Sequence, residues 1–139
     1  MKKLNKKGFT LVELLAVIVI LALLIVVVAN TALPAMNSAK KSTLETYAKR
    51  VVEQAKTLYT SAEIGVTVNG CTNSSATVSC TFTDIKQIMG QDADTTYSLG
   101  SSGLTITKTS DTYTISGAVT GSGYTTTIDS TATKMYATS

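Results

Sequence analysis

The sequence predicts an α+β fold in which a long N-terminal α-helix packs, by its C-terminal half, on a small antiparallel β-sheet head. Three observations support this fold. Residues 11–29 are apolar except for Glu13, an amphipathic stripe follows them, and most of the second half alternates apolar residues with Ser and Thr. With 139 residues in all, the chain has room for one small domain after the apolar helix.

The apolar run is long enough to cross a membrane. As a helix, residues 11–29 would extend roughly 28 Å, close to the hydrocarbon thickness of a bilayer. Lysines at positions 2, 3, 6 and 7 precede the run, and the next basic residues are Lys40 and Lys41. By the positive-inside rule the N-terminus is expected in the cytoplasm. An ordinary signal peptide would be cut after its apolar core at a small-residue site, which NTALPAM at residues 30–36 matches poorly.

The hydrophobic pattern then changes from continuous to striped, which predicts that one helix runs from about residue 9 to residue 63. Gly65 is a plausible C-terminal cap. Pro34 lacks a backbone N–H, so we expect a bend or a loosened turn there. The alternative is a single-pass anchor followed by an independent helix. The stripe consists of Leu44, Tyr47, Ala48, Val51, Val52, Ala55, Leu58, Tyr59 and Ala62.

The remaining residues predict a β-rich head. Strands are expected at residues 77–82, 104–108, 113–119 and 124–128, and a short helix between the first two has Thr83 as N-cap and Gly90 as its end. Ser and Thr make up 22 of the 45 residues from Thr95 to Ser139. Threonine suits a half-exposed pleated surface. O-linked glycosylation is an alternative, and Asn73 in NSS is a weak N-linked acceptor pattern.

Two cysteines are the only ones in the chain, Cys71 and Cys80. Both would lie outside the cytosol, where disulfides persist, and a bond between them would close a small loop between helix and sheet. The sequence has no histidine, so we expect no metal site and no cofactor. Asp92 and Asp94 are spaced like the start of a calcium loop, whose glycine and final glutamate are missing. No catalytic constellation is visible, and the chain is not expected to be an enzyme.

The segment at residues 6–15, KKGFTLVELL, resembles the cleavage and methylation motif of type IV pilin precursors, the class III signal shared by pilins, type II secretion pseudopilins and competence pilins. The matching features are a basic leader that ends in Gly8, then Phe9, a glutamate as the fifth residue from the cut, and an apolar run. The resemblance implies that a prepilin peptidase cuts between Gly8 and Phe9 and methylates the new amino group of Phe9.

The resemblance also gives Glu13 a role. A charge at membrane depth costs a few kcal/mol and is usually kept for a partner. In the family this glutamate pairs with the Phe9 amine of a neighbouring subunit and sets the register of a growing filament. The alternative is that Glu13 lies near the headgroups and is hydrated. Family members often carry a helix-bending proline earlier than Pro34 and a glycine where this chain has Ala22.

Removal of the leader changes the charge balance. The full chain has 12 basic and 9 acidic side chains, and the loss of four leader lysines leaves eight against nine. This balance argues against a nucleic-acid partner. We therefore expect a leader at 1–8, an apolar helix at 9–33, an amphipathic helix at 34–64 and a β-rich head at 65–139.

The resemblance implies a structural subunit, with a major pilin as the leading interpretation. It would wait in the membrane and then polymerise through its helix into a homo-oligomeric surface filament used for adhesion or twitching motility. Its partners would be the prepilin peptidase, the assembly platform and a cytoplasmic ATPase. The alternatives are a type II secretion pseudopilin, a competence pilin for DNA uptake, or an anchored binding protein that never polymerises.

Overall fold

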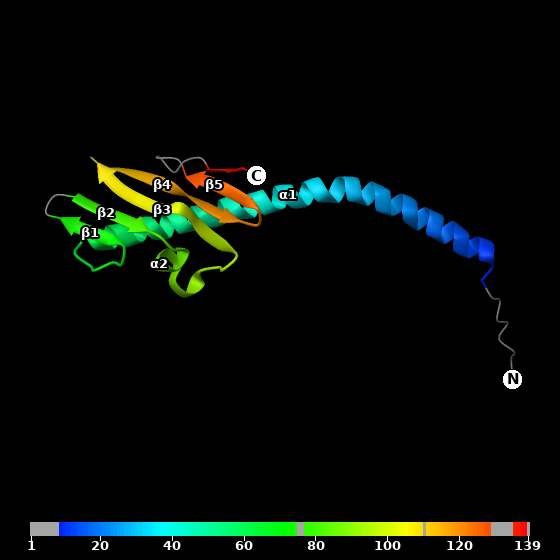
Figure 1. Ribbon diagram of the computed structural model, residues 1–139, viewed down its shortest axis with the longest axis horizontal. Helices are drawn as coiled ribbons and strands as arrows, with labels where there is room; N and C mark the ends of the chain where they lie inside the picture. Colours follow the sequence, from blue (N-terminus) through cyan, green and yellow to red (C-terminus); the bar gives the residue numbers. More distant parts are fainter. Residues whose placement is uncertain (1–8, 75–76, 110, 129–134, 139) are drawn as a thin grey trace, which may run out of the picture. The chain divides into compact units, whose positions relative to one another are not determined.

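The fold is α+β, as predicted. The computed structural model describes residues 9–74, 77–109, 111–128 and 135–138 (Figure 1). The chain divides into two compact units, residues 1–38 and 39–139. The helix α1, Leu11–Glu63, contributes to both units.

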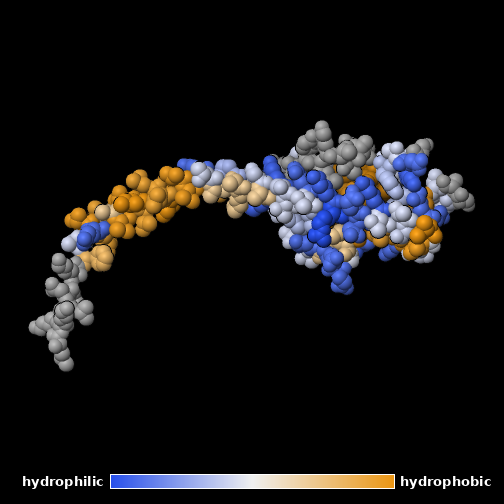
Figure 2. Space-filling model, turned by 180° about the vertical axis from the view of Figure 1, so that it is seen from behind, coloured by the Kyte–Doolittle hydropathy of each residue, from blue (hydrophilic) through white to orange (hydrophobic). Residues whose placement is uncertain are grey.

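In the first unit the apolar part of α1 is bare. Its large apolar side chains between residues 9 and 28 are each 50–86% exposed. Figure 2 shows this apolar surface on one face of the helix. By length and composition α1 is the one described helix able to cross a membrane, with a mean hydropathy of 3.4 over its most apolar window. Exposed apolar surfaces of this size are typical of segments that contact lipid or other protein chains.

The helix is continuous through Pro34. Just before it, the Thr31 hydroxyl donates to the backbone carbonyl oxygens of Val27 and Val28, at 3.3 and 3.2 Å. Hydroxyls that bond back onto the preceding turn often bend a helix, as proline does. The bend at Pro34 stays a prediction.

In the second unit the helical stripe is buried as expected, except that Leu58 is only partly buried. The helix ends at Glu63, and Gly65, with φ at +91°, donates its N–H to the carbonyl of Ala62. The expected glycine cap is therefore present. The buried helical residues are Leu44, Tyr47, Ala48, Val51, Val52, Ala55, Tyr59 and Ala62.

Six antiparallel strands form one sheet in chain order. All four predicted strands are present, and two short edge strands, β1 and β6, were missed. The strand β3 begins seven residues earlier than predicted, at Tyr97, and contains an irregularity in which residues 100–103 lie opposite Ala118 alone. The strands are β1 (Cys71–Ser74), β2 (Thr77–Phe82), β3 (Tyr97–Thr109), β4 (Thr112–Gly121), β5 (Tyr124–Ile128) and β6 (Met135–Thr138).

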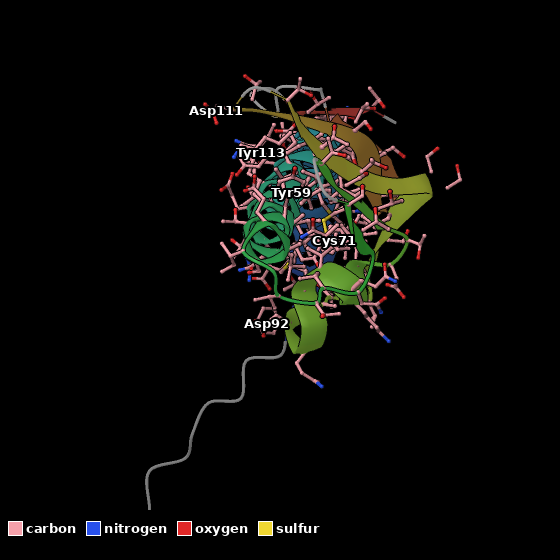
Figure 3. The ribbon with its side chains drawn as sticks, turned by 90° about the vertical axis from the view of Figure 1, so that its left-hand side faces the viewer. Tyr59, Cys71, Asp92, Asp111 and Tyr113 are labelled. Carbon is pink, nitrogen blue, oxygen red and sulfur yellow. A yellow bond between two sulfur atoms is a disulfide. The ribbon has the colours of Figure 1, made fainter. Side chains whose placement is uncertain are left out.

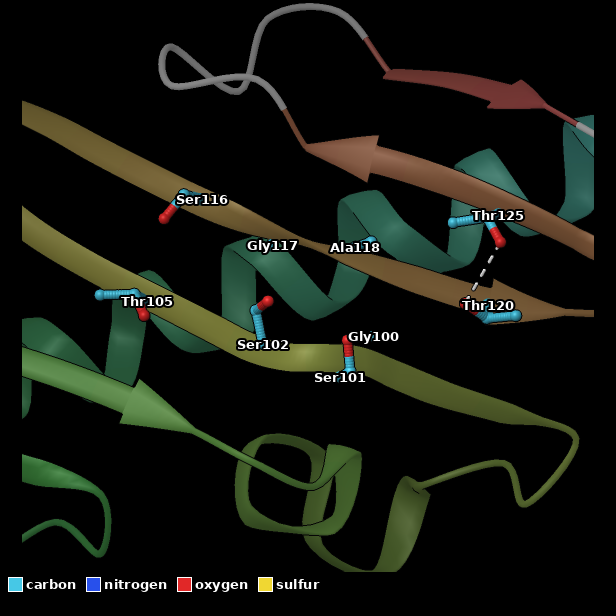
Figure 4. A pocket seen from close by; sticks show the side chains of 9 residues that line it. All are labelled: Gly100, Ser101, Ser102, Thr105, Ser116, Gly117, Ala118, Thr120 and Thr125. Atoms are coloured by element: carbon cyan, nitrogen blue, oxygen red, sulfur yellow. Dashed lines mark hydrogen bonds between the residues drawn. The ribbon is translucent and has the colours of Figure 1, made fainter.

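The two faces of the sheet differ in chemistry. The inner face packs on the helical stripe through buried residues that include Phe82, Leu104, Ile106, Ile115 and Val119. The outer positions are mostly Ser and Thr and lie opposite one another, as in the row Ser98, Thr120, Thr125 and Thr138. Beside the β3 irregularity this face has a hydroxyl-lined hollow of about 660 Å³ (Figure 4). The Ser and Thr at the outer positions of the sheet match the interpretation of threonine as a residue of a half-exposed pleated surface.

The short helix is α2, Ile85–Met89, and the predicted cap was one residue off. Asp84, rather than Thr83, is the N-cap: its carboxylate accepts from the Lys86 N–H at 3.0 Å, and the Gln87 side chain accepts from the Asp84 N–H. A carboxylate is also favoured beside the positive end of a helix. A 3₁₀ turn, η1 (Gly90–Asp92), follows directly.

A disulfide joins Cys71 to Cys80, as predicted, but it connects two strands rather than helix and sheet. The two residues are directly opposite each other in β1 and β2, with a Cα–Cα distance of 4.0 Å. Figure 3 labels Cys71 and shows the yellow sulfur–sulfur bond beside α1. The loop between them is a hairpin. The crosslink is expected to stabilise the head by roughly 2 to 3 kcal/mol in the chain-entropy model.

Thr126 is a polar residue in this core, and its replacement is expected to stabilise the head. The side chain is fully buried on the inner face of β5, and its hydroxyl has no hydrogen-bond partner among the described residues. Because valine has the same shape without the hydroxyl, Thr126→Val should raise the free energy of unfolding by about 1 kcal/mol. Urea denaturation of the full chain in detergent checks this, with the exposed Thr127→Val as control. A loss of stability in Thr126→Val would contradict it.

Tyr59 and Lys108 make the head sensitive to alkali. Burial, and then the charge of Glu63, raises the pKa of the Tyr59 phenol, while a hydrogen bond to Glu63 raises the pKa of the Lys108 ammonium. Both folded values lie above the unfolded ones, so this stabilisation is complete below about pH 10 and is lost as pH rises through the folded values.

Tyr59→Phe should lower the free energy of unfolding of the head at neutral pH. It should also make the loss of that free energy in alkali less steep. The Tyr59 hydroxyl donates to the Val78 carbonyl at 3.0 Å, so its removal should cost about 1 kcal/mol at neutral pH. Above about pH 10 the variant should lose stability less steeply than the parent, with the remaining slope due to Lys108. Urea midpoints from pH 7 to 11 measure both effects. Parallel pH profiles for parent and variant would contradict the assignment.

Candidate functional site

The predicted processing and assembly residues lie at the start of α1. Phe9 is the first described residue and is 86% exposed. Gly8, the other half of the predicted cleavage site, lies outside the described residues. Phe9 thus lies two residues before the first residue of α1, with an exposed side chain.

Glu13 closes the first turn of the helix. Its Oε2 accepts hydrogen bonds from the Thr10 backbone N–H at 2.8 Å and from the Thr10 hydroxyl at 2.9 Å. The Thr10 hydroxyl oxygen in turn accepts from the Glu13 N–H at 3.3 Å. This reciprocal arrangement is a capping box, which satisfies backbone donors that have no partner within the helix.

Thr10 is a site residue that the sequence analysis missed. The available signal was T-x-x-E, Thr10 to Glu13, directly before an apolar run. The pattern was not used, because Glu13 was interpreted either as an assembly charge or as a hydrated group near the headgroups. The capping box gives Glu13 a role within its own chain as well: its carboxylate stabilises the N-terminal turn and is still exposed to solvent.

The other predicted site residues do not join this segment. Cys71 and Cys80 form the disulfide of the head, and Pro34 lies inside α1. Asp92 ends η1 and is exposed, while the Asp94 carboxylate accepts the Thr96 N–H at 2.8 Å. Within the described ranges no three His, Cys, Asp or Glu side chains are grouped as metal ligands would be.

Comparison with known proteins identifies the N-terminal segment. A model of the prokaryotic N-terminal methylation motif matches residues 3–29. Neither the curated proteins nor the solved structures gave a match to this chain. The matched segment includes Phe9, the Thr10–Glu13 capping box and the bare apolar helix. Residues 3–29 thus match the prokaryotic N-terminal methylation motif, which is the class III signal peptide of type IV pilin-like precursors.

Proposed function

We propose that this chain is the precursor of a structural subunit, a major pilin of a type IV pilus, which polymerises through α1 into a surface filament. The observation that carries the proposal is the methylation motif followed by an apolar helix whose large side chains between residues 9 and 28 are exposed in the part of the chain that the structure describes. The motif itself supports a type IV pilin-like protein. An apolar surface of this length can be covered either by lipid or by the packed helices of neighbouring subunits.

In the proposed sequence of events the leader keeps the N-terminus in the cytoplasm until a prepilin peptidase cuts between Gly8 and Phe9. The peptidase then methylates the Phe9 amine. Assembly exchanges lipid contacts for contacts between helices, driven by an assembly platform and its ATPase. Glu13 neutralises the Phe9 amine of the next subunit, so that neither charge is buried unpaired. Adhesion or twitching motility would follow from filament extension and retraction.

The main alternatives are a type II secretion pseudopilin and a competence pilin. Favouring DNA uptake, Lys40, Lys49 and Arg50 are exposed along α1. Against it, the chain without its leader carries eight basic and nine acidic side chains. A phosphate-binding protein normally presents a clear excess of positive charge.

Shearing of cells that express the chain separates these functions. The proposal predicts that the protein is released as filaments many subunits long, and that a Gly8→Val variant, blocked at the cut, stays in the membrane fraction. Lys6→Gln is the matched control in the leader and should still yield filaments. Release of no filaments from the parent would contradict the pilus. Salt-dependent retention of DNA by the parent protein would favour the competence alternative.

A further inference from the structure

A small cavity lies on one flank of α1, within the second unit. It has a volume of about 310 Å³ and lies between α1 residues 42–50 and the segment from Asp94 to Tyr97. We name it the Arg50 pocket. Its lining includes Ser42, Thr46, Tyr47, Arg50, Asp94 and Tyr97.

The floor of the Arg50 pocket is held in place by two tyrosines. The rings of Tyr47 and Tyr97 stack with their centroids 4.2 Å apart and their planes inclined by 21°. A Cβ at Gly121 would overlap the Tyr97 ring, so the backbone there lies against this ring. The Tyr47 hydroxyl oxygen accepts the Asp94 N–H at 3.0 Å, which ties the loop to the helix. The tyrosine side of the pocket is therefore fixed before any ligand arrives.

The rim carries one positive and one negative charge. A hydrogen bond from the Thr96 N–H holds the pKa of the Asp94 carboxyl below its usual range, so Asp94 is ionised at neutral pH. Arg50 makes no ion pair within the part of the chain that the structure describes. Its guanidinium offers up to five N–H donors. The formal charges of the rim sum to zero.

This mixture of groups selects a class of ligand. Arg50 can only donate hydrogen bonds, the Asp94 carboxylate can only accept them, and the Ser42 and Tyr47 hydroxyls can do both. A free anion would face the carboxylate and a free cation would face the guanidinium, whereas each hydroxyl of a polyol can both donate and accept. The volume is at the low end for small-molecule sites, enough for one ring rather than a chain. We propose that the Arg50 pocket binds one ring of a neutral sugar.

Binding at a single pocket is expected to be weak, because the volume of about 310 Å³ is at the low end for small-molecule sites. A filament would repeat the pocket along its length, and linked sites gain about 10² to 10⁴ in avidity without any new contact. Adhesion through many repeated pockets depends on the proposed filament. Binding of a sugar to a single pocket does not depend on the filament.

Saturation-transfer NMR on the unassembled full chain tests the proposal, in a detergent without a sugar headgroup. The probes are glucose, galactose, N-acetylglucosamine and, as a charged comparison, glucuronate. At least one neutral sugar should show saturation. Arg50→Gln and Asp94→Asn should each weaken its binding by about fivefold, the equivalent of one hydrogen bond of about 1 kcal/mol. Asp94→Asn keeps an oxygen for the Thr96 N–H, and Lys49→Gln, an exposed α1 change outside the pocket lining, should bind like the parent.

Three results would overturn the sugar pocket. The first is that no neutral sugar shows saturation. The second is that the parent and both pocket variants bind the sugar equally well. The third is that glucuronate is the only probe that binds and that Asp94→Asn strengthens its binding. The last result would identify an oxyanion site instead. Because the protein is unassembled here, failure of this test leaves the filament proposal intact. In the same way, the absence of filaments from sheared cells would not contradict the proposed sugar binding.

Discussion

Glu13→Gln is expected to reduce surface filaments by at least tenfold while cleavage and membrane insertion continue. The glutamine loses the charge that the proposed filament uses to neutralise the Phe9 amine of a neighbour. Its amide oxygen can still accept the Thr10 N–H, as the carboxylate does at 2.8 Å. A loss of about 1.4 kcal/mol per subunit contact already gives a tenfold change in an equilibrium constant. Counting filaments by electron microscopy, with immunoblots of cleaved and uncleaved protein, measures the effect.

Thr10→Val is the matched control, because it weakens the capping box and keeps the charge. It removes the hydroxyl that donates to Glu13 at 2.9 Å and accepts from the Glu13 N–H. Loss of an N-cap hydroxyl costs about 1 kcal/mol of helix stability. Filament number should therefore stay within about twofold of the parent, a small change on this scale. If Thr10→Val abolished filaments and Glu13→Gln did not, Glu13 would act as a helix cap rather than as an assembly charge.

Gly103→Ala is expected to destabilise the head by about 2 to 5 kcal/mol, the sum of backbone strain and overpacking. Gly103 lies in the β3 irregularity with φ at +68°, a left-handed conformation that costs alanine about 1 to 2 kcal/mol. A Cβ there would also overlap the backbone carbonyl oxygen of Phe82. Neighbouring strand backbone has little freedom to move away, so the clash adds to the strain.

Gly123→Ala separates the two contributions to this loss. Gly123 also has a positive φ, at +83°, but a Cβ there would meet no atom within 4 Å. It should therefore lose only the strain energy, about 1 to 2 kcal/mol. The free energies of unfolding of both variants, from urea titration of the full chain in detergent, give the comparison. Equal losses in the two variants would show that contact with Phe82 adds nothing.

The sequence was most informative where one pattern ran long. The apolar run, the helical stripe and Gly65 placed α1 almost to the residue, because a periodic face must be buried somewhere. The alternation of strands β2, β4 and β5 predicted a sheet for the same reason. Their register was not predictable, since it depends on which strands meet.

The misses occurred where tertiary contacts override local preference. The strand β1, CTNS, has no apolar alternation, and it pairs with β2 beside the Cys71–Cys80 bond. Residues 97–103 contain two glycines and three serines and suggest a turn, yet they extend β3 because the irregularity accommodates them against β4. The Arg50 pocket brings together residues more than forty positions apart, from Arg50 to Asp94, a separation at which the sequence carries no local signal.

The proposed function requires that the leader is removed at Gly8 and that the cleaved chain is assembled on the cell surface. Intact mass spectrometry of protein sheared from cells, with imaging of the same fraction, tests both steps. The predicted result is a filament-rich fraction whose mass lacks residues 1–8, gains about 14 Da for a methyl group and loses about 2 Da for the disulfide. A protein found only in membranes, at the full precursor mass, would contradict the claim.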